Sequence, residues 1–394
     1  MSNLTVKSFD SYQIPAGWRN WLILCIESQD GVFGFSEFTD SNSSEATLIT
    51  AINEIGNLLK NKKFDSIEEI VLNLRRKYRQ ALPGIMFKAI SAFENALWDL
   101  KSKSDGRPIS SYFTSLNLLH NQQSFKCYWS HCPTTRIRAS EHIGLSPILK
   151  NDDLVELGNE ISKLKFSAFK TNLIQIAPSP AVLMPGFNKN FDLITEKIPK
   201  NYPESFRNII DSILNESNDF EIIIDFNFNL DYDNFISIQN SLHGLKIKWL
   251  EVDFDEIELY EQILRHKQFP ICTGENVLGV YNYNGILNDD RIDIISIDLL
   301  WNGLHESLKI AEKAIAHNKK IAVHNYCGSL ATSMALVFLS MLPTDSIELL
   351  EYDYDDVSWR DTIVSNPAKF NNGSLQYTPG LGWNNDFLLN KVSV

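Results

Sequence analysis

The feature that most constrains the fold is a recurrence of short apolar runs in the last two thirds of the chain. From about residue 125, each run is followed by polar residues and then by a stretch with helical periodicity. Eight such runs can be counted: FKCYWSH, FSAFK, EIIIDF, IKWLE, PICTGE, DIISID, KIAVH and IELLE. Strand and helix alternating eight times predict a (β/α)8 barrel. A doubly wound sheet is the alternative, but eight units are present and no Gly-rich phosphate fingerprint follows the first strand.

The first part of the chain has a different pattern. Residues 3–14 and 21–38 indicate two or three antiparallel strands, with Asp30 and Gly31 at a hairpin turn. Segments with helical spacing of apolar residues follow, among them GIMFKAISAFENALWDLKSK. We therefore predict an α/β protein with three parts: an N-terminal α+β capping domain in residues 1–120, a TIM-type barrel in residues 121–360 and a C-terminal segment in residues 361–394.

Charge and composition restrict the partners. The chain of 394 residues carries a formal net charge of −13 and no block of Lys and Arg residues, which argues against nucleic acid or an anionic membrane surface and favours a small ligand. No apolar stretch approaches the ~20 residues that cross a bilayer, and the start, MSNLTVKSFD, lacks the pattern of a signal peptide. The five cysteines are scattered, which suits reduced thiols. We expect a cytoplasmic protein.

Ionisable residues lie at or next to the end of nearly every run. From the third run onward they are separated by 23 to 27 residues, about one strand–helix unit each, whereas the longer gap before the third run indicates an insertion, APSPAVLMPGFNKNF. Residues at the carboxyl ends of barrel strands point into the mouth where such barrels place their chemistry. We therefore expect seven of them to converge as one polar ring, made of Lys170, Asp225, Glu251, Glu275, Asp298, His324 and Glu351.

Three of these residues suggest a metal site. Asp225, Glu251 and Glu275 end consecutive strands and supply hard oxygen ligands, which Mg²⁺ prefers while keeping positions open for water or substrate. Each acid alone would be an ordinary strand-end residue in a solvated loop. The regular spacing of the triplet favours the metal site.

These residues resemble the enolase superfamily, specifically its mandelate racemase subgroup and the acid-sugar dehydratases within it. In the first domain, GVFGFSEF resembles the hairpin of that family that ends in Glu, and ALWDLKSKSDGRP resembles its helix followed by Gly-x-Pro. In the barrel, FKTN, IIIDFN, WLEVDF, CTGEN and the stretch from IDIISID to IAVHN match the family's strand ends in order. PGLGWNNDF resembles its C-terminal motif, which implies that the C-terminal segment returns to the capping domain.

The resemblance implies removal of a proton next to a carboxylate, with an enediolate intermediate. It implies that Asp225, Glu251 and Glu275 hold Mg²⁺, which would stabilise the developing charge. His324 would be the base, and Asp298, one strand earlier, would fix its tautomer and stabilise the imidazolium.

Two further roles follow from the same resemblance. Lys170 would lie beside the substrate carboxylate and add positive charge there. Glu351 would hydrogen-bond the enediolate in its protonated form. Barrels of this family usually assemble, so a homo-oligomer is expected.

One departure from the family pattern bears on the reaction. Where a racemase of the subgroup has Lys-x-Lys, this chain has Lys170-Thr171-Asn172, and strand alternation makes Asn172 the counterpart of the second lysine. An amide cannot act as a base near pH 7, so His324 alone would remove the proton and return it to the departing β-hydroxyl in a syn dehydration. Asn227 stands where some sugar-acid dehydratases have a histidine, and we expect it to orient substrate or a metal-bound water.

Substrate contacts are expected from two segments. In PAGWRNW, Trp18, Arg19 and Trp21 are candidates for the far end of a substrate; on and after the first barrel strand the candidates are Tyr128, Trp129, His131, Arg136 and Arg138. Any of the aromatic residues could instead belong to the core. The expected substrate is a small-molecule carboxylate, a polyhydroxylated sugar acid. A racemase, an epimerase or a cycloisomerase would use the same metal site, and a non-catalytic metal-binding barrel remains an alternative because fold does not fix function.

Overall fold

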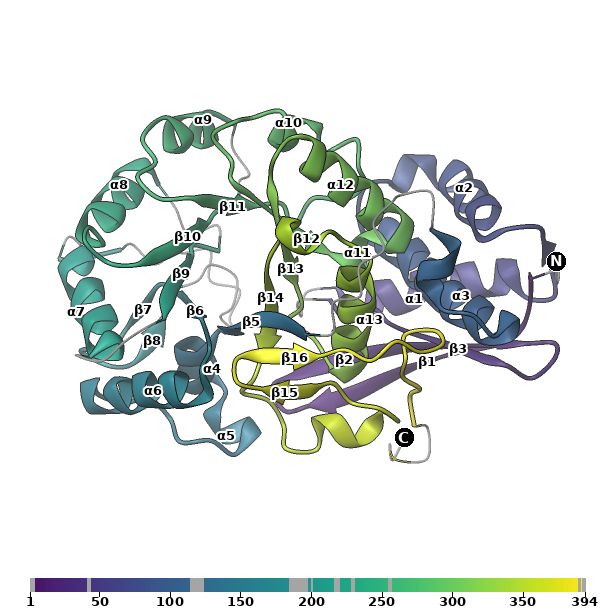
Figure 1. Cartoon of the computed structure of the whole chain (residues 1–394), viewed down its shortest axis with the longest axis horizontal. Helices are drawn as coiled ribbons and strands as arrows, with labels where there is room; N and C mark the ends of the chain where they lie inside the picture. Colours follow the sequence, from purple (N-terminus) through teal and green to yellow (C-terminus); the bar gives the residue numbers. More distant parts are fainter. Residues whose placement is uncertain are drawn as a thin grey trace.

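The computed structural model describes residues 4–40, 44–113, 124–183, 198–199, 201–215, 220–227, 231–253, 257–388 and 391. Eight parallel strands form a barrel (Figure 1), which confirms the predicted fold class. The barrel is closed because the last strand pairs with the first, with Glu351 opposite Tyr128. The strands are β5 (Ser124–Ser130), β6 (Ala168–Asn172), β9 (Glu221–Asp225), β10 (Ile247–Glu251), β11 (Ile271–Thr273), β12 (Ile294–Asp298), β13 (Lys320–His324) and β14 (Ile347–Asp353).

The strand register places the strand ends at one rim. Asp225 pairs with Asn172 on one side and with Glu251 on the other, and Asp298 pairs with His324. Below this rim the barrel interior is filled by one apolar layer with a residue from each strand: Tyr128, Ala168, Ile223, Trp249, Cys272, Ile294, Ala322 and Leu349. The buried isoleucines of β9 explain its continuous apolar run, because parallel strands are covered on both faces.

Helices connect the barrel strands and surround them (Figure 1). After β5 come the short helices α4 (Cys132–Arg138) and α5 (Ser140–Ile143), and the insertion after β6 contains the two-stranded hairpin of β7 (Ile174–Gln175) and β8 (Ala181–Val182). Residues 184–191 of the predicted insertion lie outside the described residues. The remaining helices are α6 (Asn151–Leu164), α7 (Tyr202–Leu214), α8 (Tyr232–Ser241), α9 (Ile257–Arg265), α10 (Asn284–Leu287), α11 (Leu299–Asn302), α12 (Leu304–Ala316) and α13 (Ser329–Ser340).

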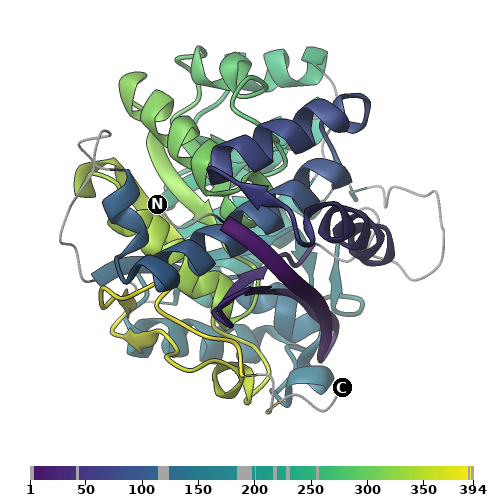
Figure 2. The same cartoon turned by 90° about the vertical axis from the view of Figure 1, so that its right-hand side faces the viewer.

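The N-terminal domain is an antiparallel sheet with three helices (Figure 2). The long hairpin of β2 and β3 turns where predicted, at Gly31, whose φ of 77° suits glycine. The elements are β1 (Leu4–Ala16), β2 (Arg19–Ser28), β3 (Phe33–Glu37), β4 (Lys63–Phe64), α1 (Glu45–Leu59), α2 (Ile67–Lys77) and α3 (Ile85–Asp105). Short 3₁₀ turns lie at η1 (Arg79–Ala81), η2 (Ile109–Tyr112), η4 (Thr344–Ser346) and η5 (Arg360–Ile363).

Two buried carboxylates of this domain bind the first turns of barrel helices. Glu37, at the end of β3, accepts the backbone N–H groups of Gly328 (2.7 Å) and Ala331 (2.9 Å) at the start of α13. Glu94, on α3, accepts the backbone N–H of His305 (2.7 Å) in the first turn of α12. Each carboxylate satisfies helix donors that have no partner within the helix, which ties the domain to the barrel.

The C-terminal part contacts both other parts. β15 (Lys369–Asn371) and β16 (Ser374–Gln376) form a hairpin, and β16 pairs antiparallel with β5 (Figure 1). Further along, Asp99 of α3 accepts the backbone N–H of Trp383 at 2.8 Å, and the ring of Phe387 lies 6.4 Å from that of Phe35. Within the described residues, the helices are all too short or too polar to cross a membrane.

Candidate active site

The structure brings all seven residues of the polar ring to the carboxyl ends of the barrel strands. Lys170 is fully buried, and its Nζ lies among three carboxylates, 2.9 Å from Glu351, 3.2 Å from Glu251 and 3.4 Å from Asp225. Trp249 donates its indole N–H to Glu251 at 3.1 Å. A buried ammonium surrounded in this way compensates charges that would be costly alone.

His324 and Asp298 form the pair that the sequence predicts. The imidazole Nδ1 lies 2.7 Å from Asp298 Oδ2, and both side chains are buried. Asp298 also accepts the backbone N–H of Trp301 at 2.8 Å, so its orientation is fixed from two directions. The free nitrogen of His324, Nε2, faces Glu275 at 3.6 Å and Glu351 at 3.8 Å. This nitrogen is available for a proton at the centre of the ring.

The ring carries an excess of negative charge. Burial alone would lower the pKa of His324, but Glu275, Glu351 and Asp298 outweigh burial and raise that pKa to about 10. Burial raises the pKa of Glu275 well above its usual value, and nearby Glu251 and Asp253 add to the rise. Crowded carboxylates with too few cations thus raise the pKa of His324 and add to the effect of burial on Glu275. The ring therefore retains protons in this arrangement.

Lys170 lowers the pKa of two carboxylates next to it. Burial alone would raise the pKa of Glu351, but Lys170 and His324 hold it well below its usual value. The same lysine, together with His131, lowers the pKa of Asp225 against the effect of burial. In this structure the carboxylate of Glu351 forms an ion pair with Lys170 and accepts a hydrogen bond from Ser130, which favours its ionised form. The protonated form expected beside an enediolate stays a prediction.

The carboxylates fit a hard divalent cation by their chemistry. Glu275 Oε2 is buried and has no hydrogen-bond partner among the described residues, and the crowding described above is what a bound cation would relieve. The described residues nevertheless contain no three His, Cys, Asp or Glu side chains already gathered at metal-binding distance. Lys170 lies between Asp225 and Glu251, so its ammonium supplies the positive charge on that side of the ring.

His131 lies in the same ring as a second buried imidazole. Its Nε2 is 3.1 Å from Asp225 Oδ2, and its Nδ1 is 2.7 Å from the Ser130 hydroxyl. Burial and the charge of Lys170 lower the pKa of His131, which favours the neutral form. The predicted substrate residue therefore lies against the first candidate metal ligand.

Both predicted amide residues lie at the ring. Asn172 donates a long hydrogen bond of 3.5 Å to the backbone carbonyl of Asp225. Asn227, with φ of 45°, donates its backbone N–H to Asp225 Oδ1 at 3.0 Å, and its buried Nδ2 has no partner in the part of the chain that the structure describes. An unpaired amide donor beside the ring is available to a ligand.

Other predicted substrate residues have different surroundings. Tyr128 lies on the same face of β5 as Ser130 but one layer deeper, where it packs edge-on against Trp249 in the barrel core. Arg19 is buried, and its guanidinium is paired with Asp353 (2.6 Å) and Asp356 (2.7 Å). Tyr128 is therefore a core residue and not part of the open side of the ring.

The remaining candidates lie further from the ring. Trp18 contacts it through Tyr326, whose ring lies 5.6 Å from Trp18 and 4.9 Å from His131. Among the rest, Trp21 packs on Trp359, Trp129 on Phe166 and Tyr354, Arg136 pairs with Asp355 and Glu160, and Arg138 lies over Trp18. In the structure these side chains therefore pack against other residues or form ion pairs within the protein.

Four further residues contact the ring that sequence analysis did not single out. Asn325 donates its backbone N–H to Glu351 at 2.9 Å, and Trp301 packs its indole against His324, with ring centroids 5.3 Å apart. Asp253 lies two residues after Glu251, and burial, Glu251 and Asp225 raise its pKa to about 7. Strand alternation could have indicated Asp253, and also Ser130 at the end of the first strand, whereas Asn325 and Trp301 carry no local signal.

Comparison with known proteins identifies the family. Residues 163–387 match the family model described as the enolase C-terminal domain-like family. Residues 16–113 match the N-terminal domain of the mandelate racemase and muconate lactonizing enzyme family. The chain belongs to the enolase superfamily, in the mandelate racemase/muconate lactonizing enzyme subgroup. Members of this superfamily are enzymes, so the chain is an enzyme of this superfamily.

Its relatives have several activities. The chain is 23% identical to D-galactarolactone cycloisomerase of Agrobacterium fabrum over 95% of this chain and 91% of the relative. It is 24% identical to D-gluconate/D-galactonate dehydratase of Picrophilus torridus over 96% and 91%. A solved structure from Burkholderia xenovorans, to which L-alanine-DL-glutamate epimerase activity is attributed, was determined with magnesium and fumarate; it is 26% identical, covers 99% of this chain and 95% of its own, and has a TM-score of 0.91.

Proposed function

We propose that this enzyme is a magnesium-dependent acid-sugar dehydratase that removes the proton next to a carboxylate and eliminates the β-hydroxyl, which gives a 2-keto-3-deoxy sugar acid. The observation that carries the proposal is the His324–Asp298 pair at the rim of the barrel, together with Asn172 in the position where a second lysine base would stand. The dehydratases among its relatives support the choice of reaction.

Three residues of the ring would carry out the proton transfers and stabilise the charge. His324 in its neutral form accepts the α-proton at Nε2, while Asp298 holds Nδ1 at 2.7 Å and stabilises the imidazolium. A cation held by the neighbouring acids would favour that neutral form, because it would offset the carboxylates that raise the pKa of His324. Lys170 supplies positive charge where negative charge grows on the substrate carboxylate. The same imidazolium then returns its proton to the departing β-hydroxyl, so that both transfers occur on one face of the substrate.

The metal would be held by Asp225, Glu251 and Glu275. When bound, Mg²⁺ would supply positive charge beside the substrate carboxylate and so lower the pKa of the α-proton. Asn227 has a buried amide donor that no described residue binds, and it would orient a hydroxyl of the substrate.

Isomerisation in the same site is the second candidate. His131 favours it, because this neutral, buried imidazole lies 3.1 Å from Asp225 and could serve as a second proton carrier. A two-base site would epimerise or cyclise a substrate. One relative of the chain is named D-galactarolactone cycloisomerase.

A screen of sugar acids with Mg²⁺ tests the proposal. We expect at least one acid to give a 2-keto product, detected as its semicarbazone, and expect His324→Asn to form none. The same acids in D₂O separate the candidates by NMR: α-proton exchange with an inverted centre or a lactone, and without keto acid, supports the isomerase. His131→Asn is the partner variant: where this protein still binds Mg²⁺ through Asp225, a two-base reaction should be lost and a one-base dehydration should remain. No keto acid from any member of the library would refute the dehydratase.

A further inference from the structure

The short helix α11 lies between the polar ring and the N-terminal domain. Its residue Trp301 contacts both members of the His–Asp pair. The backbone N–H of Trp301 donates to Asp298 Oδ1 at 2.8 Å, while Asp298 Oδ2 lies 2.7 Å from His324 Nδ1. The indole packs on the imidazole at 5.3 Å between ring centroids, with an interplanar angle of 47°.

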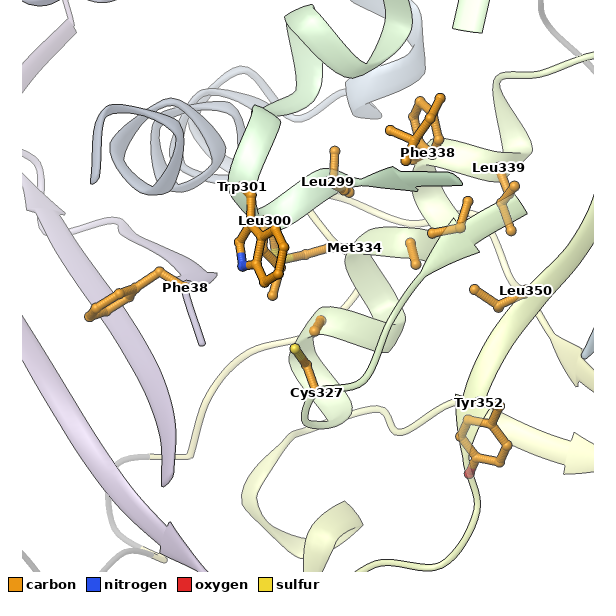
Figure 3. Packing of buried hydrophobic residues seen from close by; sticks show 14 of the residues in the cluster. Phe38, Leu299, Leu300, Trp301, Cys327, Met334, Phe338, Leu339, Leu350 and Tyr352 are labelled. Carbon is orange, nitrogen blue, oxygen red and sulfur yellow. The ribbon is translucent and has the colours of Figure 1, made fainter. Parts of the chain in front are cut away.

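The other side of the same indole is held by the N-terminal domain. Trp301 Nε1 donates to the backbone carbonyl of Thr39 at 3.2 Å. Lys88 of α3 places its Nζ 3.7 Å from the centroid of the indole and donates to Asp40 at 2.7 Å. A cation over the face of a tryptophan is attracted by the quadrupole of the ring. Figure 3 shows Trp301 between the chain that carries Phe38 and the helix that carries Met334.

The helix backbone is tied to the N-terminal domain as well. Asn95 of α3 donates its side-chain N–H to the carbonyl of Leu299, the first residue of α11, at 3.2 Å. It also accepts the backbone N–H of Leu304 at 3.0 Å, at the start of α12. Both ends of the short helix are thus fixed from outside the barrel.

A tryptophan that only fills space does not need these contacts. The indole N–H groups of Trp21, Trp98, Trp129 and Trp383 are buried without a hydrogen-bond partner among the described residues. Trp301 differs because its N–H, its ring face and its backbone N–H each have a partner. Such contacts fix the rotation of the ring as well as its position.

We propose that Trp301 is a positioning residue through which the N-terminal domain sets the orientation of the His324 imidazole. Lys88 and Thr39 hold the indole on one side, and the indole holds the imidazole on the other. The inference rests on the proposed role of His324 as the base. It adds that docking of the N-terminal domain is a requirement for that role, separate from any contact of the domain with substrate.

An experiment that needs no substrate tests the contact. The protein is labelled with [¹³Cε1]histidine, which gives one signal for each of its eight histidines, and the signal of His324 is assigned by its loss in His324→Asn. We expect the His324 signal to shift in Trp301→Leu and Lys88→Met. The matched control is Lys101→Met, because Lys101 also lies on α3, over the ring of Tyr112 and paired with Asp105, and we expect no shift there.

A kinetic experiment tests the consequence with the sugar acid found by the screen. Trp301→Leu should lower kcat about 100-fold with little change in KM, because a misplaced base slows chemistry more than binding. Trp301→Phe keeps an aromatic face and should recover part of kcat. A His324 signal that is unchanged in both Trp301→Leu and Lys88→Met, a shift of equal size in Lys101→Met, or an unaltered kcat in Trp301→Leu would each overturn the proposal. If no acid is turned over, the proposed function fails, and the NMR result alone still decides whether Trp301 positions His324.

Discussion

Glu94, which connects the N-terminal domain to the barrel, should make the stability of the protein depend on pH. Its side chain is 1% exposed, and its Oε1 accepts the backbone N–H of His305 at 2.7 Å, whereas its Oε2 has no hydrogen-bond partner within the described residues. Burial raises the pKa of Glu94 to about 7, and neither the His305 N–H nor the nearby Arg75 guanidinium compensates fully. The carboxyl is therefore protonated in the folded protein at pH values where the unfolded chain has released the proton.

The sign and size of the effect follow from this difference. Because the folded pKa lies above the unfolded value of 4.5, the stabilisation is complete below pH 4.5 and is lost as the pH rises to about 7. The gap between the two values corresponds to about 3 kcal/mol of unfolding free energy. Glu94→Gln keeps the oxygen that accepts from His305 but cannot ionise. We expect the unfolding free energy of this variant to be about 3 kcal/mol higher than that of the wild type at pH 8, which makes the variant more stable there. At pH 4.5 we expect the two unfolding free energies to be nearly equal.

Urea unfolding followed by circular dichroism at both pH values measures this difference. Glu69→Gln is the control, because Glu69 is an exposed acid at the start of α2 that accepts one backbone N–H, and we expect little change at either pH. The comparison between variants removes the contributions of other buried acids, which are common to both proteins. A Glu94→Gln protein that is less stable than the wild type at pH 8, or that differs from it equally at both pH values, would refute the reasoning.

Three further predictions concern the ring and the domain contact. Lys170→Met leaves three buried carboxylates without their cation, so the unfolding free energy in EDTA should fall by about 3–5 kcal/mol, and added Mg²⁺ should restore part of it; no restoration by Mg²⁺ would contradict the proposed metal site. Asp225→Asn should weaken Mg²⁺ binding measured by isothermal titration calorimetry, and an unchanged affinity would exclude Asp225 as a ligand. Glu37→Ala removes the acceptor for two N–H groups of α13 and should lower the free energy of unfolding in urea by about 2 kcal/mol, whereas Glu37→Gln, which keeps one acceptor oxygen, should lower it less. Equal stability of the wild type and both variants would argue that Glu37 is not a helix cap.

The amino-acid sequence determined the barrel and the membership of the polar ring. Eight apolar runs, a near-constant spacing from the third run onward and an ionisable residue at or next to the end of nearly every run are local patterns, and the period of a strand decides which side chains share a face. Asp225 is adjacent to Glu251 in the register, and Asp298 is adjacent to His324, because neighbouring parallel strands end at one rim. This register brings the members of the His–Asp pair next to each other.

The tertiary structure decided which partners the ring residues have. Lys170 lies among three carboxylates, which keeps Glu351 ionised, and Tyr128 lies in the core one layer below. Arg19 could be taken from the sequence as a substrate contact, but it is paired with Asp353, more than 300 positions away in the chain. The protonation of a buried group and the orientation of an imidazole depend on charges and contacts contributed by distant segments. No local pattern encodes them, because they exist only once both domains have folded against each other.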